Sequence, residues 1–139
     1  MTSDQIRARV ESVCAGAPFA LTRAQTPFSF DLQPSGAIDD VFRLEQGGSE
    51  VIGGFNYSED RTDELQLWVA KKYQGDPEGT YQRLLTDASS VRAAVIRDGL
   101  SSGDYIVPDT PAGFSVQRDP GKEYAVLRLT IGVNYEATT

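Results

Sequence analysis

Four carboxylates gather in one short stretch of the sequence, at Glu59, Asp60, Asp63 and Glu64. Converging carboxylate oxygens can hold Ca²⁺ or Mg²⁺, and two carboxylates about 5 to 9 Å apart can hydrolyse a glycosidic bond. The spacing matches no calcium-binding loop, however, and Arg61 stands in the middle of the run. A charged hairpin loop is the commoner origin of such a stretch. We therefore expect no metal site, catalytic residue or bound cofactor here, with a carboxylate-based hydrolase as an alternative.

Residues suited to other kinds of catalysis are scarce. The chain has no histidine, which removes the commonest general base and the commonest ligand of transition metals. The single cysteine, Cys14, falls near Val10 and Val13 on a predicted helix, which favours a buried structural thiol over a nucleophile. The glycine pairs at 47–48 and 53–54 lack the lysine and hydroxyl residue of a phosphate-binding loop. These residue types favour a protein that is not an enzyme.

Composition sets wider limits on the fold and on the partners. A chain of 139 residues fits one domain, here residues 1–139, and can bury roughly 70% of its unfolded surface without disulfides. The formal net charge of −7 argues against dedicated nucleic-acid binding, because such binding depends on basic side chains that contact phosphates. The sequence has no apolar run of membrane-spanning length and no basic-then-apolar start. We therefore expect a soluble protein made in the cytoplasm.

Two amphipathic helices are predicted. Thr2 and Gln5 have the spacing of a capping box at the start of a helix from Ser3 to about Ala15. A second helix opens at Asp76-Pro77-Glu78, which supplies a capping residue, a proline at the first helical position and a carboxylate in the first turn. Its apolar stripe comprises Tyr81, Leu84, Leu85, Ala88, Val91 and Val95. Gly99 is predicted to follow its last residue.

Between these helices we expect a long connection and then three strands in a meander. The connection, residues 19–40, is broken by prolines and holds one short extended piece at Phe28, Phe30 and Leu32. A hairpin follows, with arms at 41–45 and 50–57 and a glycine-tolerant turn at 46–49. Residues 58–63 are expected to form a polar loop, and a third strand runs from Leu65 to about Tyr73.

The last strand has the clearest pattern in the chain. From Glu123 to Glu136, every odd position from 125 to 135 is apolar or aromatic, which predicts a long strand with one buried face. Short extended pieces at 105–107 and 114–118 precede it, and residues 119–122 are predicted to turn the chain into it. The order of elements is helix, three strands, helix, then two or three strands. This order predicts an α+β fold of two layers, a mixed or antiparallel β-sheet packed against two helices.

The faces of these strands opposite the predicted core suggest a surface for a partner. If Leu65, Leu67 and Val69 point inward, Trp68 points outward, where a large aromatic side chain is unusual. An alternative is that Trp68 belongs to a second core layer beneath a helix or beneath the long connection. The residues that we expect at a subunit or partner interface are Trp68 on the third strand, Tyr124, Val126, Arg128 and Thr130 on the last strand, and Glu59, Asp60 and Arg61 in the polar loop. Arg128 could form an ion pair with an acidic partner, or all of these residues could belong to an exposed face.

The whole pattern resembles the tail terminator proteins of long-tailed bacteriophages and of phage-derived particles such as gene transfer particles. The segments that carry the resemblance are V-F-R-L-E, E-L-Q-L-W-V-A, D-P-E-G-T-Y-Q-R-L-L and A-V-L-R-L-T-I-G-V-N-Y-E, in that order, after an N-terminal helix. Together they cover nearly the entire chain. Residues 19–40 depart from the pattern, and we interpret them as an arm that could reach a neighbouring subunit.

The resemblance implies a structural protein that forms a ring, usually of six copies, at the neck end of the tail of a virion assembled in the host cytoplasm. Such a ring stops polymerisation of the tail tube protein and docks the tail to the head–tail connector protein. DNA would pass through its lumen without specific binding, and the acidic balance of the chain would suit that passage. Head–tail joining, tail-completion and tail tube subunits share the size and are alternatives of the same class. A monomeric ligand-binding module is an alternative of another class.

Overall fold

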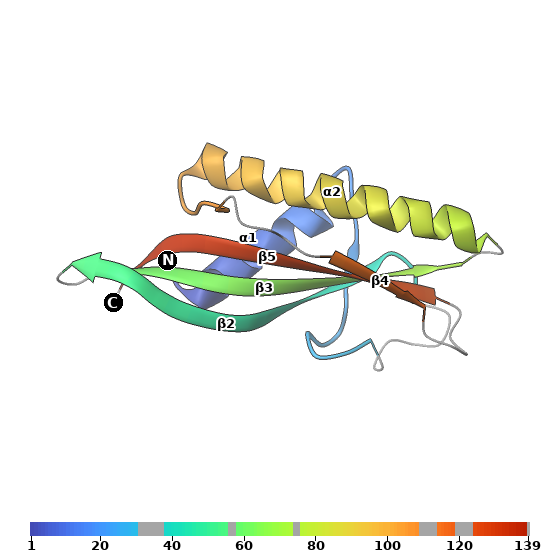
Figure 1. Ribbon diagram of the computed structural model, residues 1–139, viewed down its shortest axis with the longest axis horizontal. Coiled ribbons are helices and arrows are strands. Elements are labelled where there is room, and N and C mark those ends of the chain that lie inside the picture. The colour runs from blue at the N-terminus through green and yellow to red at the C-terminus, as the bar shows by residue number, and fades with distance from the viewer. Residues whose placement is uncertain (31–37, 56–57, 74–75, 109–113, 119–123, 139) are drawn as a thin grey trace.

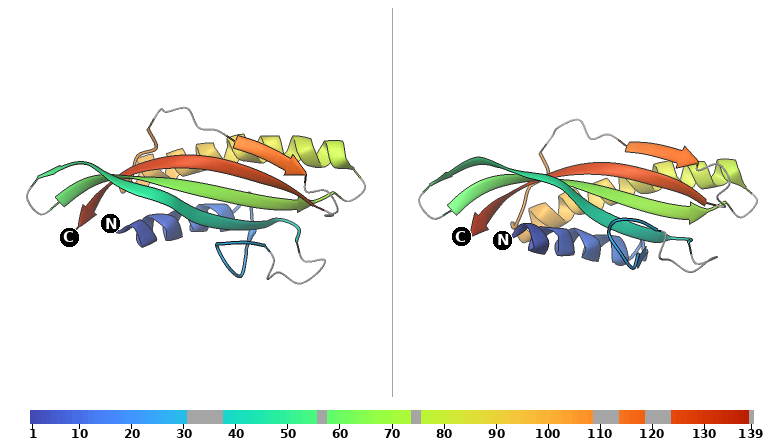
Figure 2. Two further views of the ribbon diagram at one scale, coloured as in Figure 1. Left: turned by 60° about the horizontal axis from the view of Figure 1, so that its bottom comes forward. Right: turned by 90° about the horizontal axis from the view of Figure 1, so that it is seen from below.

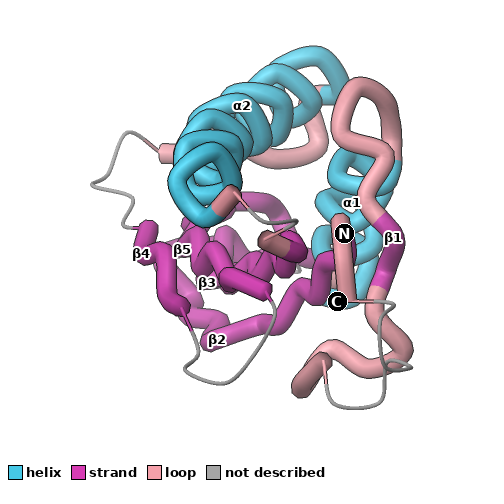
Figure 3. The backbone as a smooth tube through the Cα atoms, turned by 90° about the vertical axis from the view of Figure 1, so that its right-hand side faces the viewer, coloured by secondary structure: helices cyan, strands magenta, loops and turns pink. Residues whose placement is uncertain are grey.

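A computed structural model of the chain describes residues 1–30, 38–55, 58–73, 76–108, 114–118 and 124–138 (Figure 1). Two helices and five strands follow one another as α1 (Ser3–Ala15), β1 (Thr22–Arg23), β2 (Val41–Phe55), β3 (Ser58–Lys72), α2 (Pro77–Ser102), β4 (Phe114–Arg118) and β5 (Tyr124–Thr138). The strands form one mixed sheet in the order β1-β2-β3-β5-β4, and both helices lie on the same side of it (Figures 2 and 3). The predicted α+β class, with a mixed sheet and two helices, is confirmed.

Both helices begin as their capping residues predict. The Thr2 side chain accepts a hydrogen bond from the backbone of Gln5, whose own side chain accepts one from the backbone of Thr2. Asp76 caps α2 in the same way, with its carboxylate accepting a hydrogen bond from the backbone of Gly79. The predicted end of α2 is wrong, because the helix continues through Gly99 to Ser102. The residue that ends it is Gly103, which adopts a left-handed φ of 72°.

The predicted hairpin is wrong in its position. Residues 46–49 form no turn, since β2 runs unbroken from Val41 to Phe55 and pairs along its length with β3. The glycines at 47–48 lie at one irregularity in the register, between Gln46 and Gly48, and Gly53 borders a second, between Val51 and Gly53. A β-bulge absorbs an extra residue without ending a strand, and this explains why a turn signal is misleading here. The predicted polar loop at 58–63 is therefore the first half of β3.

The remaining connections differ from prediction in smaller ways. The long connection contributes a two-residue strand, β1, which pairs in parallel with Val41 and Phe42 at the edge of the sheet. Phe28 and Phe30 lie in no strand, and Leu32 falls outside the described residues, as does the predicted turn at 119–122. The predicted strand at 105–107 is reduced to a single bridge between Ile106 and Asn134, whereas β4 matches its prediction at 114–118.

The core lies between the sheet and the helix layer. The alternation predicted for β5 is confirmed, because its odd-numbered residues from 125 to 135 are all buried. They pack against the apolar stripe of α2 and the buried face of α1, namely Leu84, Ala88, Val91 and Val95 with Ile6, Val10 and Cys14. Tyr81, predicted for the same stripe, is exposed. Neither helix is of the length and apolar character that a membrane-spanning helix requires, within the residues that the structure describes.

Candidate subunit interface

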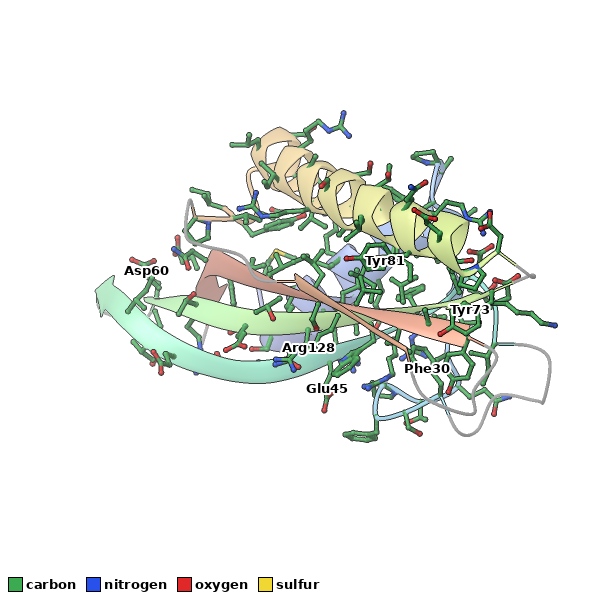
Figure 4. All side chains as sticks on the ribbon, turned by 45° about the vertical axis from the view of Figure 1, so that its right-hand side comes forward. Phe30, Glu45, Asp60, Tyr73, Tyr81 and Arg128 are labelled. Atoms are coloured by element: carbon green, nitrogen blue, oxygen red, sulfur yellow. The ribbon has the colours of Figure 1, made fainter. Side chains whose placement is uncertain are left out.

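The face of the sheet opposite the helices, which we call the open face, gathers most of the predicted interface residues. Residues directly opposite one another on paired strands share a face. Arg43 on β2, Trp68 on β3 and Arg128 on β5 are paired in this way and form one row across the sheet. Figure 4 shows Arg128 and Glu45 on the side of the sheet away from α2. The open face is therefore built from side chains on three neighbouring strands.

Trp68 is the centre of that row. The guanidinium carbon of Arg43 lies 4.3 Å from the centroid of the Trp68 ring and 5.3 Å from that of Phe30, within the range of cation–π attraction. Arg128 lies over the same indole at 5.6 Å. Arg43 is held in place because it donates to the backbone oxygen of Pro27 at 2.8 Å and to Glu45 at 3.2 Å. Arg128 is exposed and has no carboxylate partner among the described residues, so it is the cation of the row that is free to bind one.

The long connection covers one end of the open face. A small second cluster of buried residues comprises Ala24, Phe30, Val41 and Ala70, with Trp68, Tyr124 and Val126 partly buried against it. Trp68 is half-buried as a result, and its indole Nε1 atom is buried without a hydrogen-bond partner in the part of the chain that the structure describes. At this end of the open face, Trp68 therefore lies in a second apolar cluster beneath the long connection. This is one of the alternatives that the sequence leaves open. Thr130, also predicted, lies further along β5 and is half-buried.

The predicted charged residues Glu59, Asp60 and Arg61 lie on β3, near the end where Ser58 pairs with Phe55 of β2. Glu59 and Arg61 are on the same side of the strand and form an ion pair at 2.8 Å. Asp60 and Glu64 belong to the open face, whereas Asp63 faces the helix layer and is buried. The four carboxylates of this stretch do not converge, and the described residues include no group of three that could hold a metal ion.

Asp63 has a structural environment of its own. Its carboxylate accepts hydrogen bonds from the Tyr135 hydroxyl at 3.1 and 3.2 Å and from the Gln46 side chain at 3.3 Å. The Tyr135 hydroxyl is also 2.8 Å from the hydroxyl of Ser3, in the first turn of α1. Buried polar groups need such partners, since an unpaired one costs about 1 to 3 kcal/mol. This network ties the start of α1 to β2, β3 and β5.

Neither Arg43 nor Phe30 was expected in this cluster from the sequence. Arg43 alternates with Phe42 and Leu44, so its outward direction could be predicted, but its neighbours depend on the register between β2 and β3. Phe30 arrives from a segment without regular structure, for which no periodic signal exists. These two side chains are the part of the cluster that only tertiary structure assembles.

The position of Cys14 gives a direct chemical prediction. The thiol is buried beneath α1, and burial, with a smaller contribution from Glu11, raises its pKa to about 12. A thiolate is the reactive form, so at pH 8 the folded protein should react with a thiol reagent at least a hundredfold more slowly than the protein in denaturant. Reaction with a chromogenic disulfide, followed by absorbance, would measure both rates. Equal rates in the two states would contradict the buried position.

No protein-family model matches the chain, and no curated protein is significantly similar to it in sequence. A functional assignment must therefore depend on the sequence pattern and on the geometry of the open face.

Proposed function

We propose that this protein is a structural subunit of a bacteriophage virion or phage-derived particle. In this proposal it acts as a tail terminator that forms a ring, of six copies, at the neck end of the tail. The ring caps the tube of tail tube protein and docks to the head–tail connector protein. The observation that carries the proposal is the sheet itself. Strands β2, β3 and β5 have 15 residues each and are about 50 Å long, and together they present the open face. The paired ends of β2 and β3 at Phe55 and Ser58, which we call the hairpin, extend past both helices (Figures 1 and 2).

The long strands extend past the helix layer that covers them, which supports a role in assembly. Strands of five or six residues are usual in a globular core, so the extra length needs another purpose. Val51 and Ile52, on the projecting part of β2, are 55% and 54% exposed. Neighbouring exposed apolar side chains are typical of surfaces that bind other proteins. A projecting hairpin and a separate open face give each subunit two different contact surfaces, as a closed ring of head-to-tail interfaces requires.

The charge of the chain is compatible with the proposed lumen. A net charge of −7 would repel the phosphate backbone and let DNA pass without adhering. Head–tail joining, tail-completion and tail tube subunits would use the same features, so they remain alternatives within the class. The separation of Asp63 from Asp60 and Glu64 across β3 gives no support to a hydrolase built on these carboxylates.

The proposal predicts ring formation and capping of tubes. Purified protein should be examined by light scattering and negative-stain imaging, alone and after mixing with tail tubes assembled from the tube protein encoded in the same genome. We expect rings at the tube ends and no further elongation of capped tubes. Some terminators assemble only on the tube, so a monomer in solution that still caps tubes would also support the proposal. A protein that stays monomeric and never binds tube ends would contradict it.

A further inference from the structure

The open face carries acidic side chains toward the paired ends of β2 and β3 and basic side chains from its middle onward. Toward the hairpin its exposed side chains include Glu50, Asp60, Glu64 and Glu136, and none of these forms an ion pair within the described part of the chain. The basic residue of this region, Arg61, lies on the other side of β3 with Glu59. From the middle of the sheet toward its other end lie Arg43, Arg128 and Lys72, and Glu45 forms an ion pair with Arg43. Figure 4 shows Asp60 near one end of the sheet and Arg128 near its middle.

The acidic end is hollowed at Glu64. This residue is paired with Gly48 on one side and Gly132 on the other, so no side chain flanks it in its row. A Cβ atom added at either glycine would meet none of the described residues within 4 Å. A pocket of about 330 Å³ begins here: Glu50, Glu64 and Thr130 line it from the open face, and Arg92 of α2, its single basic side chain, lines it together with Val107 and Pro108. Its volume is close to the lower end for small-ligand sites, and it is large enough for one long side chain.

The basic end offers a side chain of matching chemistry. Arg128 is exposed, extends from a rigid central strand and stands beside Trp68, whose ring lies 5.6 Å from its guanidinium carbon. A guanidinium binds a carboxylate through two parallel hydrogen bonds and also stacks on aromatic rings. Within one copy, Arg128 lies four residues along β5 from Gly132, the partner of Glu64, which is about 13 Å, and the described residues form no ion pair between Arg128 and Glu64.

We infer that a second copy of this chain is the partner of the open face, with Arg128 of one copy bound in the Glu64 pocket of the next. The inference rests on the proposed assembly function and names the surfaces that would join the subunits. Both sites lie on the open face, so two copies that meet there bind reciprocally, each with its Arg128 in the pocket of the other. Complementary charge favours this orientation, since two acidic ends or two basic ends placed together would repel.

Charge reversal tests this contact. Arg128→Glu and Glu64→Arg, each alone, should weaken self-association at least tenfold, measured by sedimentation velocity or, for assembly that needs the tube, by ring occupancy at tube ends. An equimolar mixture of the two variants should recover association, because the reversed pocket of one variant meets the reversed side chain of the other. The double variant should recover it as well. Arg97→Glu, an exposed reversal on α2, is the matched control and should change nothing.

The outcomes separate this inference from the proposed function. Single reversals that associate normally, or a mixture that does not recover, would overturn the inference. If a reversal variant fails to fold by circular dichroism, Arg128→Gln and Glu64→Gln give the same test with a neutral side chain and should each weaken association. Protein that caps tubes but is insensitive to these changes contradicts only the inference. Protein that self-associates through this pair but never binds tubes contradicts only the terminator role.

Discussion

Replacing Leu129 with aspartate is expected to unfold the protein. Leu129 is 2% exposed and lies on β5 opposite Leu67, in the core between the sheet and the helices. Removal of a buried leucine costs about 2 to 5 kcal/mol, and the new carboxylate would be buried without a partner, which adds several more. A domain of this size is usually stable by about 5 to 15 kcal/mol, so the loss takes most or all of its stability. Urea denaturation followed by circular dichroism would measure it.

The adjacent residue provides a matched control. Thr130 is on the same strand but belongs to the open face, where it is half-buried. Thr130→Asp places the same carboxylate one residue away, in contact with water, and should change the free energy of unfolding by no more than about 1 kcal/mol. If both variants lose the same stability, the two faces of β5 do not differ as described. A folded Leu129→Asp variant with an unchanged urea midpoint would show that the core lies elsewhere.

The elements that the sequence predicts well are those with a strong periodic pattern and defined ends. The capping residues Thr2 and Asp76 begin their helices as expected, and the alternation of β5 matches its burial over six positions. These signals are local, because each depends on side chains within one element. The two-layer α+β fold could be predicted for the same reason, since the order of such elements restricts how they can pack.

The errors occur where local signals compete with pairing. Glycines at 47–48 are typical of a turn, yet strand pairing continues past them because a bulge accommodates them. Because the sequence predicts a turn at 46–49, it also predicts a loop for Glu59, Asp60 and Arg61, although they lie on β3. The open-face row of Arg43, Trp68 and Arg128 needs the register of three strands, which no single segment encodes. The outward direction of Trp68 and Arg128 was predictable, but their neighbours were not.

Gly99 is the residue at which sequence and structure give opposite expectations. A glycine inside a helix normally costs about 1 kcal/mol relative to alanine, so propensity alone predicts that Gly99→Ala would stabilise α2. In the structure, however, a Cβ atom at Gly99 would lie 2.6 Å from the backbone oxygen of Tyr105 and 2.7 Å from its ring. Tyr105 cannot move aside easily, because it is buried and its hydroxyl donates to Val95 at 2.9 Å and to Asp98 at 2.8 Å.

We therefore expect Gly99→Ala to lower the free energy of unfolding by about 2 kcal/mol, since overpacking a tight contact usually costs about 1 to 3 kcal/mol. Gly48→Ala is the matched control, because it adds the same methyl group where nothing in the described structure lies within 4 Å. Its effect should stay within about 0.5 kcal/mol. Thermal and urea unfolding of the two variants beside the unmodified protein would decide between propensity and packing. A gain in stability at Gly99 would mean that Tyr105 does not pack on α2 as described, and the closure of the core at this end of the helix would need another explanation.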